Sequence, residues 1–170
     1  MVIIVMGIVG AGKTTVGQLL AQELGWHFAD ADDFHPAANV EKIRNGIALT
    51  DADRAPWLAA LRGAIIQWSA LRENFVLACS ALKRAYRDEL RAAPVIFVYL
   101  KASPELVLGR LRARHGHFAT ESILSTQLED LEEPEDAITV PIDHSPDAIV
   151  AEIIAQVKGK QVAYPDATKK

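Results

Sequence analysis

The feature that most constrains this chain is an eight-residue segment near its N-terminus. Residues 7–14 read Gly-Ile-Val-Gly-Ala-Gly-Lys-Thr, and they directly follow an apolar run at residues 2–6. This is the GxxxxGK[ST] pattern, in which glycines let the backbone wrap so tightly that successive N–H groups point at phosphate oxygens. The pattern requires a strand before it and a helix after it. We therefore predict a strand, a phosphate-binding loop and a helix, in that order.

Each part of this loop has a separate predicted role. Lys13 is expected to reach the β and γ phosphates of a nucleoside triphosphate, and the hydroxyl of Thr14 is placed to ligate Mg²⁺. The helix that begins there adds the positive end of its dipole to the anion site. The alternative is a glycine-rich turn without a ligand, and the neighbouring strand and helix patterns weigh against it. We expect nucleotide contacts from Gly7, Gly10, Ala11, Gly12, Lys13, Thr14 and Thr15.

The length and apolar content of the chain predict one domain. With 170 residues, 50% of them hydrophobic, the chain can bury one well-filled core and is too short for two comfortable domains. We place this domain at residues 1–158. A polar C-terminal tail without catalytic duty is expected at residues 159–170.

Charge and cysteine content narrow the partners and the compartment. The net charge of −4 leaves no basic surface that favours nucleic acid. The one cysteine, Cys79, lies in an apolar run and excludes a disulfide within the chain, which is typical of a reducing compartment. No basic leader precedes the first apolar run, and no stretch reaches the length of a membrane helix. We therefore expect a cytoplasmic protein without nucleic acid or membrane partners.

Apolar runs of strand length recur along the chain and define the fold class. Their hydrophobicity is continuous rather than alternating, which is typical of strands buried on both faces of a parallel sheet. The segments between them have helical periodicity. We therefore predict a three-layer α/β/α fold with five parallel strands, at residues 2–6, 26–29, 75–79, 95–100 and 138–142.

Capping residues indicate where the first long helices begin and end. Residues 13–24 carry an apolar stripe, and Gly25 is available as the C-terminal cap. Residues 53–72 keep the helical period as well. The Thr50-x-x-Asp53 pair in front of them resembles a capping box.

Two later helices and a lid are predicted in the same way. The tripeptides Ser103-Pro104-Glu105 and Ser145-Pro146-Asp147 each combine an N-cap serine, a proline in the first turn and an acid near the helix dipole. A helical pattern breaks at Gly116, which predicts a small mobile lid at about residues 110–130. Pro141 cannot donate to a strand ladder, so the strand that contains it should lie at an edge or end there.

An acidic turn follows the second predicted strand. Asp30 and Asp32 alternate in an extended segment and would face one side, with Asp33 on the other. The carboxyl ends of the strands form the ligand crevice in α/β sheets, so two carboxylates would face it. We assign Asp32 as the base for an acceptor hydroxyl and Asp30 to the Mg²⁺ shell. The alternative is a solvated or helix-capping acid, which we favour for Asp33.

Two pairs of basic residues have helical i, i+4 spacing. Lys83 and Arg87 follow the third strand and would share one face of a helix that reaches the crevice. Arg110 and Arg114 lie in the lid segment, where cations closing over the γ phosphate would stabilise developing charge and exclude water. An ordinary basic helix face explains the lid pair equally well. Cys79 is interpreted as core rather than as a nucleophile.

From residue 2 to about residue 158 the chain resembles the gluconate kinases, small P-loop sugar-acid kinases related in fold to shikimate kinases. Besides the loop, the resemblance rests on ordered stretches at compatible spacing, at residues 30–36, 49–58, 79–88, 114–118 and 127–134. It implies transfer of the ATP γ-phosphoryl group to the 6-hydroxyl of D-gluconate. It also implies a homodimer, a closing lid and the strand order 2-3-1-4-5.

Carried over by position, the resemblance implies a set of substrate residues. A sugar acid offers a carboxylate, which Arg and Lys bind, and hydroxyls, which Asp, His and Gln bind. From spacing alone the histidines have no zinc-binding partners, and the resemblance favours a role at the sugar acid. The implied acceptor residues are Asp32, His35, Arg54, Lys83, Arg87, His117 and Gln127, with Arg110 and Arg114 over the nucleotide.

Some alternatives stay open on the sequence. Asp33 departs from the pattern of the family and receives no role. A kinase for another small alcohol, such as shikimate, would share the phosphate loop and the acidic turn. A switch that binds ATP without an acceptor would not need the paired carboxylates or the second basic pair.

Overall fold

A computed structural model describes residues 1–113 and 117–163 of the chain, excluding the side chains of residues 117–122 and 160–163. Its centre is one sheet of parallel strands in the order β2-β3-β1-β4-β5, which confirms the predicted sheet and strand order. The strands are β1 (Val2–Met6), β2 (His27–Asp30), β3 (Phe75–Ala78), β4 (Val95–Lys101) and β5 (Ile138–Pro141).

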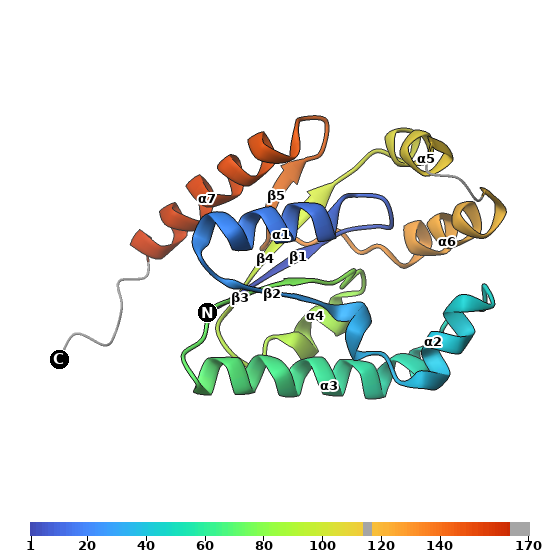
Figure 1. Ribbon diagram of the computed structural model, residues 1–170, viewed down its shortest axis with the longest axis horizontal. Helices are drawn as coiled ribbons and strands as arrows, with labels where there is room; N and C mark the ends of the chain where they lie inside the picture. The colour runs from blue at the N-terminus through green and yellow to red at the C-terminus, as the bar shows by residue number, and fades with distance from the viewer. Residues whose placement is uncertain (114–116, 164–170) are drawn as a thin grey trace.

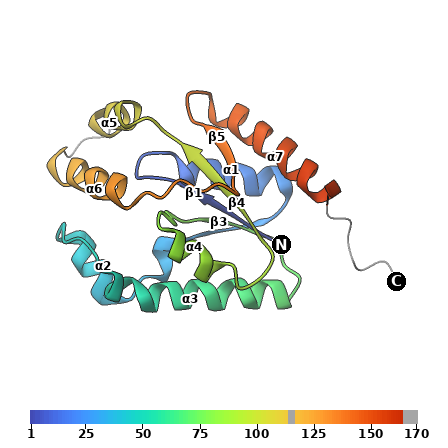
Figure 2. The ribbon, with the colours of Figure 1, turned by 180° about the vertical axis from the view of Figure 1, so that it is seen from behind.

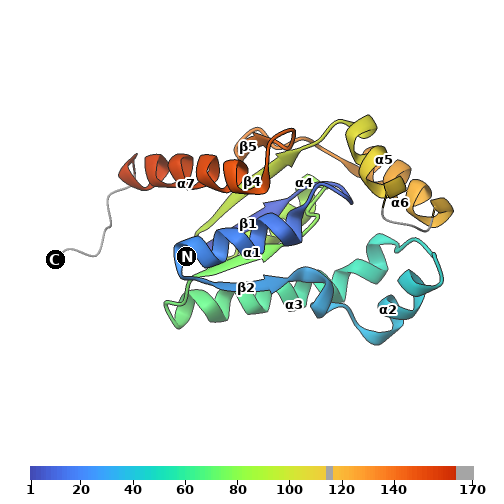
Figure 3. The same ribbon diagram turned by 45° about the horizontal axis from the view of Figure 1, so that its top comes forward.

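Helices cover both faces of this sheet. Figures 1 and 2 show α1 and α7 on one face and α3 and α4 on the other. The remaining helices gather beyond the carboxyl ends of the strands, where Figure 3 shows α2 opposite α5 and α6. The helices are α1 (Lys13–Leu24), the 3₁₀ helix η1 (Ala31–Phe34), α2 (Ala37–Arg44), α3 (Asp51–Ala70), α4 (Arg84–Leu90), α5 (Pro104–Ala113), α6 (His117–Asp130) and α7 (Pro146–Ala163).

Strand β1 shows why continuous apolar runs were the right signal for the sheet. Ile3 and Val5 are buried under α1 and α7, whereas Val2, Ile4 and Met6 are buried under α3. Both faces of the strand therefore belong to a core, and a polar residue at any of these positions would be desolvated. The phosphate loop that follows β1 is thus attached to the most buried strand of the sheet.

Capping signals located both ends of α1 and the starts of α3, α5 and α7. Gly25 ends α1 in the left-handed region, with φ 66°, and Thr50 and Asp53 form the expected capping box at the start of α3. The hydroxyls of Ser103 and Ser145 accept from the third residue of α5 and α7. Helix α3 begins at Asp51 rather than at residue 53, because the capping box places its first turn directly after Thr50.

The last strand and the last helix can be compared with the predicted edge strand and domain end. Strand β5 lies at an edge of the sheet and ends at Pro141, as the missing proline N–H predicted. Helix α7 continues to Ala163, beyond the residue at which we expected the domain to end. In the part of the chain that the structure describes, no helix is long and apolar enough to cross a membrane.

Candidate active site

The loop at residues 7–14 has the backbone that its glycines predict. Gly7, Gly10 and Gly12 have φ values of 146°, 76° and 94°, a region that side chains with a Cβ rarely adopt. A Cβ at Gly7 would also lie only 3.0 Å from the carbonyl oxygen of Leu100 in β4. The loop is therefore both strained for other residues and enclosed by the neighbouring strand, and it leads directly into α1.

The residues expected to bind phosphate and metal lie together at the start of α1. Lys13 Nζ donates to the carbonyl oxygen of Ile8 at 3.0 Å, so its ammonium lies within the curve of the loop. Thr14 Oγ1 donates to Asp30 Oδ2 at 2.9 Å. The other oxygen of Asp30 accepts from the backbone N–H of Asp32 at 3.1 Å, which ties the acidic turn to the loop.

The hydroxyl of Thr14 and the carboxylate of Asp30 are suitable ligands for Mg²⁺. Thr14 and Asp30 supply hard oxygen ligands side by side, and Mg²⁺ is commonly held by one or two carboxylates together with substrate phosphates and water. Over the described residues, no group of three His, Cys, Asp or Glu side chains is placed to hold an ion. Thr14 and Asp30 are therefore the residues that would hold Mg²⁺.

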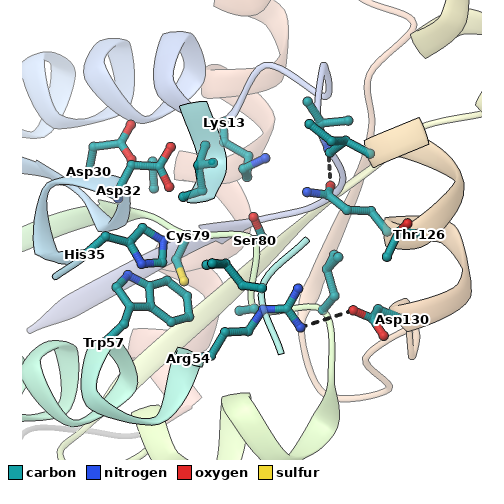
Figure 4. A pocket seen from close by; sticks show the side chains of 18 of the residues that line it. Lys13, Asp30, Asp32, His35, Arg54, Trp57, Cys79, Ser80, Thr126 and Asp130 are labelled. Carbon is teal, nitrogen blue, oxygen red and sulfur yellow. Dashed lines mark hydrogen bonds and ion pairs between the residues drawn. The ribbon is translucent and has the colours of Figure 1, made fainter. Parts of the chain in front are cut away.

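A cavity of about 460 Å³ opens in front of the loop (Figure 4). One wall carries Lys13 from the start of α1, Asp30 from the end of β2 and Asp32 from η1. The opposite wall comes from α3, α4 and α6, which lie far away in the sequence. Its polar lining residues on that side are Arg54, Tyr86, Thr126, Gln127 and Asp130.

Asp32 and His35 lie next to each other on the edge of this cavity. Burial raises the pKa of Asp32, the charge of Asp30 raises it further, and His35 and Lys13 lower it. Burial lowers the pKa of His35, which keeps the imidazole neutral near pH 7 despite the opposing effect of Asp32. The ring of His35 stacks on Trp57 at 4.8 Å, so its orientation is set by α3.

Helix α2 and the acidic turn hold this histidine in place. His35 Nδ1 lies 3.4 Å from Asn39 Nδ2, and the same amide donates to the carbonyl oxygen of Asp53 at 2.8 Å. Because an amide nitrogen can only donate, the neutral ring accepts at Nδ1 and carries its proton on Nε2. Trp57 Nε1 donates to the carbonyl oxygen of Ala31 at 2.7 Å, which fixes the stacking partner.

Five joined polar side chains form a group that we call the Arg54 network: Arg54, Tyr86 and Asp130, which line the cavity, and Lys83 and Asp51, which do not. Arg54 Nη1 donates to Tyr86 Oη at 3.0 Å and to Asp130 Oδ2 at 3.3 Å. Lys83 Nζ lies 2.9 Å from Asp51 Oδ1 and 3.5 Å from Asp130 Oδ1, and the Tyr86 hydroxyl donates to Asp51. Two cations and two carboxylates are therefore joined on the acceptor side of the cavity.

Lys83 and Arg87 do not form the pair that the sequence predicted. Lys83 is the N-cap of α4 and precedes the helix, so the two side chains do not share a helix face. Arg87 is 3% exposed and donates to the carbonyl oxygens of Ala81 and Leu82, at 3.0 and 2.7 Å. Its guanidinium braces the loop after β3 from behind, and neither Lys83 nor Arg87 lines the cavity.

The predicted lid residues lie at different places, and two of them are not described by the structure. Gln127 Oε1 accepts from the backbone N–H of Val9 in the phosphate loop at 2.6 Å. Arg110 Nη2 donates to the carbonyl oxygen of Ile142 at 2.8 Å and lines a second cavity of about 350 Å³, behind Gly10, Ala11, Gly12 and Thr15. Arg114 lies outside the described residues, as does the side chain of His117, whose backbone begins α6.

Three residues of the site carried no recognisable signal of their own in the sequence. Tyr86 and Asp130 line the cavity and bind Arg54, and Asp51 binds both Lys83 and Tyr86. Each comes from a different helix. The available hints were weak: Asp130 lies one helical turn after Gln127, and Tyr86 lies three residues after Lys83.

Comparisons with known proteins give the family of the chain. Residues 9–158 match the shikimate kinase family. The chain is 46% identical to the gluconokinase of Gluconobacter oxydans over 157 residues, which are 89% of this chain and 88% of that protein. The chain belongs to the gluconokinase family. It is likewise 39% identical to the thermoresistant gluconokinase of Escherichia coli, over 91% of this chain and 92% of that protein.

A solved structure supports the same assignment. The crystal structure of a gluconokinase from Sinorhizobium meliloti superposes with a TM-score of 0.85 at 40% identity, covering 96% of this chain and 97% of that one. A match of this extent includes the helices around the cavity as well as the sheet. The predicted P-loop kinase fold and the predicted family membership are therefore confirmed, and the protein is an enzyme of the phosphotransferase class.

Proposed function

We propose that this gluconokinase family member transfers the γ-phosphoryl group of ATP to the 6-hydroxyl of D-gluconate. The observation that carries the proposal is the position of Asp32, whose side chain lines one cavity together with Lys13 of the phosphate loop and the cation Arg54. A donor site, a base and a carboxylate-binding cation in one cavity are what a sugar-acid kinase requires. The names of the relatives identify gluconate as the acid to test first.

The acceptor is held by complementary charges and hydrogen bonds. Arg54 attracts its carboxylate, since a guanidinium offers five N–H donors and the contacts above use those on Nη1. His35, with its proton on Nε2, donates to a hydroxyl. This arrangement leaves the terminal hydroxyl of the acceptor for Asp32.

The transfer itself uses Asp32 and Lys13. Asp32 accepts the proton of the attacking hydroxyl, and its raised pKa makes it a better acceptor than an ordinary carboxylate. Lys13 leaves the carbonyl of Ile8 and neutralises charge on the β and γ phosphates. Thr14 and Asp30 would hold Mg²⁺, which would supply further neutralisation of phosphate charge when bound.

An assay across acceptors tests the proposal. ADP formation is followed with ATP and Mg²⁺ in the presence of D-gluconate, shikimate, D-glycerate or a nucleoside monophosphate. We expect stimulation by gluconate, with 6-phosphogluconate as the product by mass spectrometry. Stimulation of ADP formation by shikimate alone would make shikimate the acceptor. A rate of ATP hydrolysis that no acceptor changes would favour a nucleotide-dependent switch.

We also propose that the enzyme works as a cytoplasmic homodimer, as the family resemblance implies. Light scattering coupled to size-exclusion chromatography measures the mass in solution against 18.5 kDa for one chain. A mass of one chain at micromolar concentration would contradict the dimer. Fractionation of cells that express the protein from its natural gene tests the compartment.

A further inference from the structure

One nitrogen of the Arg54 guanidinium is already occupied by protein groups. Arg54 Nη1 donates to Tyr86 Oη at 3.0 Å and to Asp130 Oδ2 at 3.3 Å, and Figure 4 draws the second contact. Because Nη1 carries two hydrogens, these two contacts use both of them. The hydrogen bonds from this side chain to the described residues all start at Nη1. The N–H groups on Nε and Nη2 therefore remain for a ligand in the cavity that Arg54 lines.

The hydroxyl of Tyr86 joins Arg54 to a second carboxylate. It accepts from Arg54 and donates to Asp51. Arg54 Nη1 and Asp51 Oδ1 are themselves 3.7 Å apart, which is too far for a direct hydrogen bond. Burial, and after it the hydrogen bond to Asp51, raises the pKa of Tyr86, so the phenol keeps the proton that it donates. The phenol is thus a neutral spacer between a cation and a carboxylate.

Two sets of contacts hold this spacer and its partners in place. The guanidinium carbon of Arg54 lies 5.7 Å from the centroid of the Tyr86 ring, and Lys83 Nζ lies 5.6 Å from it, within the range of cation–π attraction. Asp51 accepts from Lys83 Nζ through both of its oxygens, at 2.9 and 3.2 Å. The ring and Lys83 therefore hold the partners independently of the hydroxyl. A substitution that keeps the ring and removes the hydroxyl removes the spacer alone.

We propose that Tyr86 is a positioning residue that keeps Arg54 from pairing directly with Asp51 and so leaves Nε and Nη2 for the carboxylate of the sugar acid. Without the hydroxyl, the guanidinium can turn toward Asp51 and form a direct ion pair. That carboxylate then competes with the acceptor for the same donors. The inference rests on the proposed function for the identity of the acceptor.

Calorimetric titration of four proteins with D-gluconate, each saturated with a non-hydrolysable ATP analogue and Mg²⁺, tests this role. In Tyr86→Phe the dissociation constant of gluconate should rise at least about ten-fold, as for the loss of one hydrogen bond to a charged group. Asp51→Asn alone should stay within about two-fold of the wild type, because the hydroxyl already separates residue 51 from Arg54. The double variant has no competing carboxylate at residue 51, so its constant should return to within about three-fold of the wild type.

A second tyrosine provides the matched control. Tyr99 donates its hydroxyl to Glu133 at 3.3 Å and does not line the cavity, so Tyr99→Phe makes the same chemical change elsewhere. It should bind gluconate like the wild type. All variants should also keep the wild-type dissociation constant for the ATP analogue, since Tyr86 and Asp51 do not contact the phosphate loop. This readout separates an effect on Arg54 from general damage to the fold.

The outcomes distinguish the role of Tyr86 from the proposed function. If Tyr86→Phe binds gluconate as tightly as the wild type, the inference is overturned while gluconate phosphorylation stands. The same holds if Asp51→Asn does not restore binding to Tyr86→Phe, or if it tightens binding equally in both backgrounds, because Asp51 would then not be a competitor released by loss of the hydroxyl. A wild type that neither binds nor phosphorylates gluconate would overturn the proposed function and this inference with it.

Discussion

Burial, and after it neighbouring charges, shift the pKa values of Lys13 and Asp32. Burial lowers the pKa of Lys13, and the charges of Asp32 and Asp30 act in the opposite direction. The pKa of Asp32 is raised by burial and by Asp30 and lowered by Lys13 and His35. Each of these residues thus carries a charge that the other stabilises. Removing one of them changes the protonation of its partner as well as its own chemistry.

The substitution Asp32→Asn tests whether this single carboxylate is the base that accepts the hydroxyl proton. An amide cannot accept the hydroxyl proton, so we expect kcat to fall by about 10² or more, with the KM for ATP nearly unchanged. In the wild type, kcat/KM should rise with pH through the pKa of Asp32, because only the ionised carboxylate is a base. That pKa lies above its ordinary value of 3.8. Steady-state kinetics across pH measure both effects.

The neighbouring acid provides the control for this substitution. Asp33 is exposed and carries no proposed role, and Asp33→Asn removes the same charge one residue away. It should keep kcat within a few-fold of the wild type and retain the rise in rate with pH. Near-normal turnover in Asp32→Asn would move the base to another residue.

At the scale of elements, local signals predicted more than long-range ones. The limits of α1, the capping box of α3 and the serine caps of α5 and α7 are all set by residues within one turn, and the sequence shows them directly. Continuous apolar runs located the strands to within one or two residues. The sheet and its helical layers therefore followed from sequence pattern and from the family resemblance.

The start of α4 shows where such reasoning failed. Helical spacing placed Lys83 and Arg87 on one face, but the chain first makes a loop in which Ala81 has a φ of 44°. Arg87 stabilises that loop by binding two of its carbonyl groups. The contact depends on tertiary structure, so spacing alone could not reveal it. Tyr86 and Asp130 were missed for the same reason, since they meet Arg54 only in the fold.

The junction of α2 and α3 gives a prediction about stability. Hydrogen bonds from Lys42, and then from the backbone and hydroxyl of Thr50, lower the pKa of Asp53 to about 2. A carboxyl whose folded pKa is depressed adds stability above its unfolded pKa, near 3.8, and loses it as pH falls toward 2. Asp53→Asn should therefore be less stable than the wild type at pH 5–7, and the difference should shrink between pH 4 and 2.

Urea unfolding followed by circular dichroism at several pH values measures this difference. Glu41→Gln, an exposed substitution on α2, serves as the control and should follow the wild type throughout. Midpoints of Asp53→Asn and wild type that differ by the same amount at pH 2 and pH 7 would exclude the Asp53 linkage.

At the scale of the whole molecule, the sheet brings together the elements that surround the cavity, and Arg54 of α3 also contacts Asp130 of α6 directly. The phosphate loop follows the central strand β1, and Figure 3 shows α2 opposite α6. Residues of both helices line the cavity. Three large apolar side chains at this cavity stay exposed: Ile43 at 46%, Ile47 at 53% and Ile123 at 38%. Ile43 belongs to α2, Ile47 to the segment between α2 and α3, and Ile123 to α6. A ligand that covers them adds apolar burial to the polar contacts of the site.

Nucleotide binding should consequently stabilise the whole fold against heat. A non-hydrolysable ATP analogue at one hundred times its dissociation constant adds about 2.7 kcal/mol. For a chain of this size, that corresponds to a rise in Tm of about 5–10 °C. Lys13→Ala removes the cation inside the loop and should lose most of this rise at the same analogue concentration. Lys158→Ala removes an equal charge from an exposed position on α7, and this variant should keep the full rise in Tm. Scanning calorimetry with and without the analogue measures the three shifts, and an undiminished rise in Lys13→Ala would contradict the assignment of the phosphate loop.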